Sequence, residues 1–221
     1  MSSEAALARM IDGGIVAVLR ATSGEALVEV AEALAAGGVR AVEVTFTTPG
    51  APTIIEQVAD RLGGRVVLGA GTVLDPETAR VAILSGAEFI VAPTVHLGVI
   101  ELCRRYGKIV MPGAFTPTEI LAAWQAGADV VKVFPSDCVG PAYLKALRGP
   151  LPQVRLMPTG GVNLLTAAEF LRAGACVLGI GGALVEPKAL AARDMARIES
   201  LARQYVEIVR QTRAAMAAEA K

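Results

Sequence analysis

Aromatic side chains are scarce in this sequence of 221 residues, at only 4%. A surface that stacks nucleic-acid bases depends on aromatic rings, so the sequence does not favour such a surface. Twenty-one basic residues are balanced by 21 acidic ones, and a net charge of zero attracts neither nucleic acid nor an anionic membrane. The longest apolar run, residues 173–185, contains four glycines and is too short to span a bilayer. We therefore expect neither nucleic acid nor a membrane as a partner.

Histidine is almost absent too, because His96 is the only one. A histidine-rich metal site is thereby excluded, and we expect His96 to start a helix rather than to do chemistry. Asp129 and Asp137 flank one strand-like segment without further carboxylates at neighbouring strand ends, so a metal cage is not expected. The glycine patterns of dinucleotide-binding and P-loop sites are missing as well. The sequence predicts no metal and no cofactor.

Cysteine is the third rare residue type, with three in all: Cys103, Cys138 and Cys176. An odd number without C-x-x-C spacing predicts neither a disulfide framework nor a zinc site. The first residues lead into an amphipathic helix rather than a charged and then apolar signal sequence. We therefore expect a reduced, cytoplasmic protein.

A regular alternation of strand-like and helical patterns fills the chain. Eight short apolar segments recur every 20 to 26 residues, at 15–20, 41–46, 66–72, 89–94, 109–114, 130–135, 155–160 and 176–181. Eight such units predict a closed parallel (β/α)₈ barrel, and a doubly wound sheet is the alternative. With no linker or low-complexity segment, residues 1–221 are expected to form one barrel domain that begins with a short helix at 3–12.

The helices carry recognisable start and stop signals. Thr22-x-x-Glu25 and Thr116-x-x-Glu119 match the capping-box pattern, and Asp75 precedes a proline in the same way. Glycines in left-handed conformation are expected to end four helices, at Gly37, Gly86, Gly127 and Gly174.

Lys132 lies in the middle of the apolar segment Val130–Pro135, whereas the other four lysines lie in predicted helices, loops or the tail. Burial of an ammonium group is costly, so Lys132 is either paired with a carboxylate or partly neutral. Glu43 occupies the second strand, and Arg20 ends the first. A desolvated lysine near a cation has a lowered pKa and can attack a carbonyl to form a Schiff base, with Glu43 moving protons. A buried ion pair between Lys132 and Glu43 explains the same residues, so both interpretations stay open.

Glycines follow the last two predicted strands, as Thr159-Gly160-Gly161 and Gly181-Gly182. Barrels of this class often bind phosphate at these two strand ends through bare backbone N–H groups. Tight turns would require the same glycines, but their position favours a phosphate site.

The order of six motifs, VEVTF, GAGT, FIVAPT, MPG, VVKVFPS and PTGGV, resembles that of 2-keto-3-deoxy-6-phosphogluconate (KDPG) aldolases. That family consists of Schiff-base aldolases with the (β/α)₈ fold, and it is typically trimeric. The resemblance implies that Lys132 forms the Schiff base and that Glu43 is the acid and base. It assigns the substrate contacts to Thr72 and Pro93 at the pyruvyl half, Phe134 beside the lysine, and Thr159, Gly160 and Gly161 along the sugar chain and phosphate.

Two departures from the family pattern concern substrate binding. Many members carry an arginine just after the glutamate strand, where this chain has Phe46-Thr47-Thr48, so the substrate carboxylate must use Arg20, Thr72 or backbone N–H groups. Many also carry a serine in the last phosphate loop, where this chain has Gly181-Gly182-Ala183 and only main-chain donors. Galactonate-type relatives tend to carry valine at the position of Thr159.

The resemblance implies a metal-independent lyase that cleaves a phosphorylated keto-sugar acid, 2-keto-3-deoxy-6-phosphogluconate, to pyruvate and glyceraldehyde 3-phosphate. The galactonate epimer and 4-hydroxy-2-oxoglutarate are alternative substrates of the same chemistry. A phosphate-binding barrel isomerase or synthase with Glu43 as base is a different class, and a non-catalytic ligand-binding barrel is a third. Trapping of an imine separates the first class from the other two.

Overall fold

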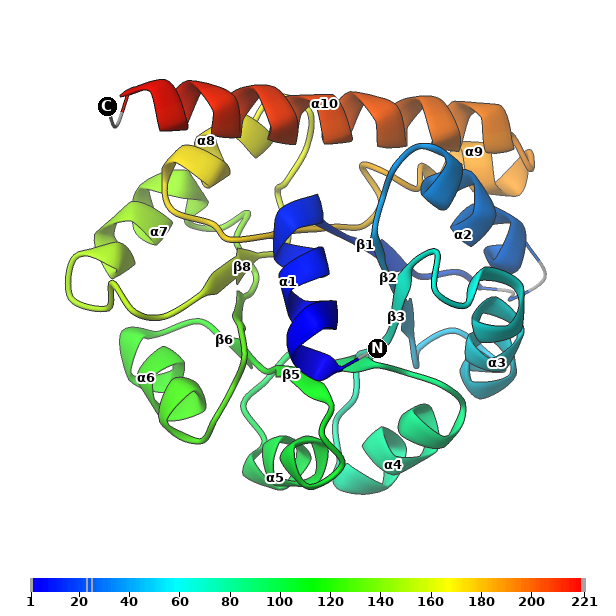
Figure 1. The fold of residues 1–221 in the computed structure, drawn as a ribbon, viewed down its shortest axis with the longest axis horizontal. Coiled ribbons are helices and arrows are strands. Elements are labelled where there is room, and N and C mark those ends of the chain that lie inside the picture. The colour runs from blue at the N-terminus through cyan, green and yellow to red at the C-terminus, as the bar shows by residue number, and fades with distance from the viewer. Residues whose placement is uncertain (1, 23, 25, 220–221) are drawn as a thin grey trace.

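Strands and helices alternate along almost the whole chain, and a computed structural model describes residues 2–22, 24 and 26–219 (Figure 1). The strands are β1 Ile15–Leu19, β2 Ala41–Thr45, β3 Val67–Gly71, β4 Phe89–Val91, β5 Ile109–Met111, β6 Gly113–Ala114, β7 Val131–Val133, β8 Leu156–Pro158 and β9 Leu178–Ile180. The helices are α1 Ser3–Gly13, α2 Leu27–Ala36, α3 Ala51–Leu62, α4 Pro76–Leu84, α5 Leu97–Arg105, α6 Pro117–Gln125, α7 Gly140–Arg148, α8 Ala167–Arg172, α9 Pro187–Ala191 and α10 Met195–Glu219.

The strands form a parallel barrel. One sheet has the order β5-β4-β3-β2-β1-β9, and a second has the order β6-β7-β8. Parallel bridges between Leu156 and Ala175 and between Thr159 and Gly179 connect β8 to β9. The helices α2 to α8 surround the strands (Figure 1). The predicted closed (β/α)₈ barrel is confirmed, and the alternative doubly wound sheet is wrong.

The predicted fifth strand is interrupted at Pro112, which separates β5 from β6. Proline has no N–H to donate to a sheet, so the ladder breaks there. The segment pairs with β4 before the proline and with β7 after it. The Pro112 carbonyl accepts the backbone N–H of Lys132 at 2.9 Å. The interruption therefore joins the two sheets next to the candidate lysine.

Inward-facing side chains fill the amino-terminal half of the barrel with an apolar layer that includes Val16, Phe89 and Met157. Helix α1 lies across this end and adds Met10 to the layer (Figure 1). The predicted short N-terminal helix is confirmed, and it ends at Gly14 with φ 73°. Because this end is closed by apolar packing, polar chemistry is left to the carboxyl ends of the strands.

Most of the predicted helix signals are confirmed. Thr116 and Glu119 form a capping box, Asp75 accepts the N–H of Thr78, and His96 caps α5 through Nδ1. Left-handed glycines follow three helices as expected, at Gly86, Gly127 and Gly174. The fourth was wrong: Gly37 has φ −74°, and the left-handed residue is Gly38 with φ 95°. The left-handed residue comes one position later because the Val39 N–H closes the helix by donating to the Leu34 carbonyl at 3.0 Å. The Thr22–Glu25 box lies partly outside the described residues.

The last predicted helix is α10, and its expected apolar face packs on the barrel. Ile198, Leu201 and Tyr205 are buried, whereas Met195 and Ile208 are partly buried against the same core. The helix runs along α8, α9 and α2 (Figure 1). Within the described residues, no helix has the length and apolarity that a bilayer crossing requires.

Candidate active site

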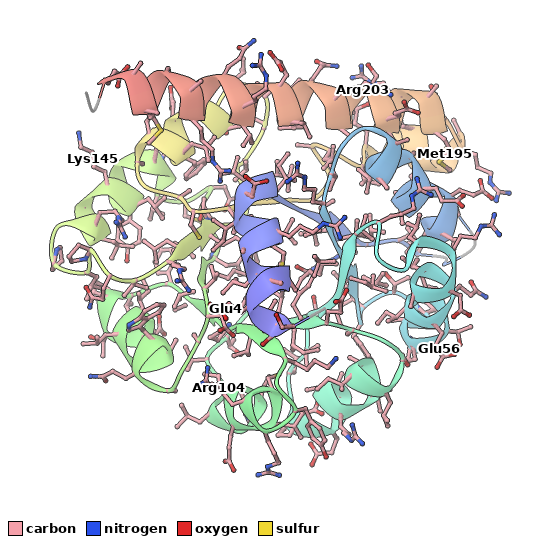
Figure 2. All side chains as sticks on the ribbon, viewed as in Figure 1. Glu4, Glu56, Arg104, Lys145, Met195 and Arg203 are labelled. Carbon is pink, nitrogen blue, oxygen red and sulfur yellow. The ribbon has the colours of Figure 1, made fainter. Side chains whose placement is uncertain are left out.

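Lys132 lies at the centre of β7, and its side chain is only 6% exposed. It follows Val130 of the apolar inner layer by two positions, so it points into the barrel on the same face. Its Nζ lies 4.8 Å from the centre of the Phe134 ring. By contrast, Lys145 on α7 is exposed at the outer surface, as Figure 2 shows. The one lysine predicted to be buried is therefore an interior amine.

Glu43 on β2 is 1% exposed and follows the inward-facing Ala41 by two positions. Gly71 on the neighbouring β3 makes room for it, because a Cβ at Gly71 would lie 1.7 Å from Glu43 Oε1. Neither carboxylate oxygen has a hydrogen-bond partner among the described residues. The satisfied Lys132–Glu43 ion pair, one of the two interpretations left open by the sequence, is therefore not formed.

Burial shifts the pKa values of the two groups toward each other. Desolvation lowers the pKa of Lys132; the Glu43 carboxylate opposes this shift, and the Arg20 guanidinium reinforces it. Desolvation raises the pKa of Glu43, against the opposing effects of Lys132 and Arg20. A lowered pKa increases the fraction of Lys132 present as neutral amine, and a raised pKa makes the Glu43 carboxyl a better proton acceptor once it is ionised.

Arg20 directly follows β1, and its guanidinium donates to the Thr72 hydroxyl at 3.4 Å. Thr72 directly follows β3 and has φ 56°, in the left-handed region that residues with a Cβ rarely adopt. The backbone thus changes direction at Thr72, at the end of β3. Arg20 and Thr72 are the two side chains predicted to bind the substrate carboxylate. The structure thus brings Arg20 and Thr72 together.

A cavity of about 480 Å³ opens at the carboxyl ends of β1, β7, β8 and β9. It brings together seven of the residues predicted to bind substrate: Arg20, Phe134, Thr159, Gly160, Gly161, Gly181 and Gly182. Lys132 and Glu43 lie deeper in the barrel, and Phe134 contacts both the cavity and Lys132 Nζ. Pro93 is not part of the cavity wall; its carbonyl packs against Gly113, where a Cβ would lie 2.3 Å from it.

The glycines of the cavity leave space on the cavity side. A Cβ at Gly182 would meet no atom within 4 Å, and one at Gly181 would come no closer than 3.9 Å to Val18. Gly160 and Gly161 have φ values of 92° and 71°, which only glycine adopts readily. The two loops therefore present bare backbone, as binding of an anion through N–H groups requires.

Thr159 lies between the lysine and these loops. Its N–H donates to the Val133 carbonyl at 3.0 Å, and its carbonyl accepts from Ser136 N–H at 2.9 Å, so β7 and the segment after it fix its backbone. The Oγ1 atom is buried without a partner among the described residues. Gly179 accommodates the side chain, because a Cβ there would lie 2.1 Å from Oγ1. The hydroxyl thus has no partner among the described residues, in a residue that lines the cavity.

Sequence patterns did not identify several residues of this site. Gly71 belongs to the GAGT motif, and its role depends on the Glu43 side chain of the neighbouring strand. The unpredicted residues of the cavity wall are Val18, Val162, Asn163, Gly179, Ala183, Val185, Pro187 and Leu190. Within residues 2–22, 24 and 26–219, no three or more His, Cys, Asp or Glu side chains are grouped so as to hold a metal ion.

Comparison with known proteins gives one consistent result. The family model described as KDPG and KHG aldolase matches residues 7–201. The 2-dehydro-3-deoxy-phosphogluconate aldolase of Treponema pallidum is 39% identical over 84% of this chain and 88% of its own length. The 2-dehydro-3-deoxy-6-phosphogalactonate aldolase of Escherichia coli is 35% identical over 88% of this chain and 96% of its own.

Solved structures give the same result. A structure of KDPG aldolase from Legionella pneumophila, with pyruvate captured as a covalent carbinolamine, superposes with a TM-score of 0.83 at 27% identity and covers 92% of this chain and 97% of its own. The chain belongs to the KDPG and KHG aldolase family. It is an aldolase, and therefore a lyase.

Proposed function

We propose that the protein cleaves 2-keto-3-deoxy-6-phosphogluconate to pyruvate and glyceraldehyde 3-phosphate through a Schiff base on Lys132. The observation that carries this proposal is the burial of Lys132 without an ion pair, which lowers the pKa of its amine. The carbinolamine captured in the Legionella pneumophila relative is the addition product of an amine and pyruvate, and it supports the same chemistry for this chain.

The proposed reaction follows from this geometry. The neutral amine of Lys132 adds to the C2 ketone and loses water, which gives an iminium. Glu43 takes the proton of the C4 hydroxyl, directly or through water, as the C3–C4 bond breaks. The bonding electrons pass into the iminium to form an enamine, and glyceraldehyde 3-phosphate leaves. Glu43 then protonates the enamine carbon, and hydrolysis of the iminium releases pyruvate and restores Lys132.

The remaining residues of the site divide between the two halves of the substrate. We assign the carboxylate of the pyruvyl half to Arg20 and Thr72, which already contact each other, with Pro93 lining that end. Phe134 packs beside the amine. The phosphate belongs in the cavity, against backbone N–H groups of the loops that contain Gly160, Gly161, Gly181 and Gly182.

The preferred epimer is proposed from Thr159. The relatives are named for either epimer, so their names do not decide it. The unpartnered Thr159 hydroxyl lies between the amine and the phosphate loops, where the C4 and C5 hydroxyls of the substrate belong. A site built to pair a hydroxyl discriminates by that hydrogen bond. We therefore expect kcat/KM to be higher for the gluconate substrate than for the galactonate epimer or 4-hydroxy-2-oxoglutarate, and a steady-state assay of all three substrates tests this order. A higher value for either alternative would contradict it.

The assembly and location of the protein are also proposals. We propose one barrel domain over residues 1–221 that works in the cytoplasm as a homotrimer. Large apolar side chains are exposed just beyond β3, β4 and β6, at Leu74 (53%), Leu97 (63%) and Phe115 (36%), and they offer a surface for contact between subunits. Light scattering should give three times the 22.8 kDa of one chain, and a monomeric mass would contradict the trimer.

A further inference from the structure

Tyr205 is a buried tyrosine on α10, outside the cavity wall and 1% exposed. It is the largest fully buried side chain of the described residues. A phenylalanine would fill the same space, so packing alone does not explain the hydroxyl. A buried phenol needs a polar partner to offset its lost hydration, and the partner of Tyr205 comes from a glycine loop of the cavity.

This partner is the Ala183 carbonyl, which accepts the Tyr205 hydroxyl at 3.4 Å. Ala183 lines the cavity next to Gly181 and Gly182, in the loop that follows β9. The Gly181 carbonyl accepts the N–H groups of Leu184 at 2.9 Å and Val185 at 3.0 Å, so the loop is a compact turn. The hydroxyl thus holds the outer side of the turn whose inner side faces the cavity.

The other loop lies close to the same phenol. The Leu164 backbone N–H opposes the rise in the pKa of Tyr205, whereas the hydrogen bond that the hydroxyl makes is the one to Ala183. Leu164 directly follows Asn163, which lines the cavity in the loop beginning at Gly160. This loop is itself fixed, because the Thr166 hydroxyl donates to the Gly161 carbonyl at 2.7 Å. The Tyr205 hydroxyl therefore bonds the loop after β9 beside a neighbouring loop that is already fixed.

The surroundings keep the phenol in the state that serves this bond. Burial raises the pKa of Tyr205 to about 12, with a further contribution from the Glu186 carboxylate. The group is thus protonated at neutral pH and can donate to the Ala183 carbonyl. Helix α10 is long and packs on α8 and α9, the helices that follow the two loops (Figure 1). It provides a rigid support behind both.

We propose that the Tyr205 hydroxyl is a positioning group that holds the glycine loop after β9 in the arrangement required to bind the substrate phosphate. The proposal rests on the function proposed above, in which the two glycine loops bind that phosphate. Because the hydroxyl acts through the loop after β9 and lies away from Lys132, its loss affects phosphate binding and leaves the amine chemistry unchanged.

The variant Tyr205→Phe tests this proposal, because it keeps the ring and removes only the hydroxyl. We expect KM for 2-keto-3-deoxy-6-phosphogluconate to rise about threefold to tenfold, the equivalent of one lost hydrogen bond, with kcat within about twofold of wild type. The inhibition constant of inorganic phosphate should rise in parallel. The rate at which pyruvate and borohydride inactivate the enzyme should not change, because pyruvate carries no phosphate.

Tyr143→Phe is the matched control. The Tyr143 hydroxyl also donates to a backbone carbonyl, that of Phe115, but it does not belong to the cavity wall. This variant should keep the wild-type KM and phosphate inhibition. Melting temperatures of all three proteins show that the assays compare folded enzymes.

The outcomes separate the inference from the proposed function. The positioning role would be overturned if Tyr205→Phe leaves KM unchanged. It would also be overturned if the rate of pyruvate trapping falls by the same factor as KM rises. If wild-type enzyme forms no adduct with pyruvate, the Schiff-base function fails instead, whatever the behaviour of Tyr205→Phe.

Discussion

Replacement of Thr159 by valine is expected to change stability and activity in opposite directions. The Thr159 Oγ1 atom is buried without a partner, and a buried unsatisfied hydroxyl costs about 1–3 kcal/mol of unfolding free energy. Valine is nearly isosteric and carries no hydroxyl. We therefore expect Thr159→Val to raise the free energy of unfolding by about 1 kcal/mol, which corresponds to a rise in melting temperature of about 2–4 °C for a protein of this size.

The same change removes a hydrogen bond from the bound substrate. Loss of about 0.5–1.5 kcal/mol of binding free energy lowers kcat/KM for the gluconate substrate by about threefold to tenfold. The difference in kcat/KM between the gluconate substrate and its galactonate epimer therefore becomes smaller. Steady-state assays of both epimers, with thermal melts of both proteins, measure the two effects together. Equal losses on the two epimers would refute the specificity argument. A fall in melting temperature would show that the Thr159 hydroxyl stabilises the fold. Capping of a helix would not explain such a fall, because the next helix, α8, begins only at Ala167.

Three further changes test the centre of the site. Glu43→Gln should lower kcat by about 10²–10⁴-fold. Because the Glu43 carboxylate raises the pKa of Lys132, its loss should also move the pH midpoint of pyruvate trapping to lower pH. If the variant turns over at the wild-type rate, Glu43 has only a structural role. Gly71→Ala places a methyl group 1.7 Å from Glu43 Oε1, so the carboxylate must move and kcat should fall by about 10²-fold, whereas an active variant would show that its position is uncritical. Incubation with EDTA should leave activity unchanged, and restoration of a treated enzyme by zinc or magnesium would contradict a Schiff-base mechanism.

The fold was predictable because local patterns agree with the tertiary structure. Apolar segments of strand length alternate with capped helices, and closure of the barrel follows from their number. The interruption of the fifth strand was not predicted. Pro112 stands inside an apolar run, and the sequence does not show that the chain changes its strand partner there.

The site was predictable where an ionisable residue stands inside an apolar strand. A lysine and a glutamate inside apolar strands are expensive, and this cost marked Lys132 and Glu43. The absence of an ion pair between them was not predictable, because it depends on side-chain geometry. The role of Tyr205 was not predicted for a similar reason. In the sequence it is one residue of an apolar helix face, and its contact with Ala183 joins segments 22 residues apart.

The central claim is that Lys132 forms an imine with the keto acid, and reductive trapping tests it most directly. Treatment of the enzyme with pyruvate and borohydride should add one pyruvyl group per chain, inactivate the protein, and place the label on the peptide that contains Lys132. Lys132→Arg should take up no label and show no turnover, because a guanidinium stays protonated. The exposed Lys145 serves as the internal control. A label on Lys145, or no label at all, would contradict the account.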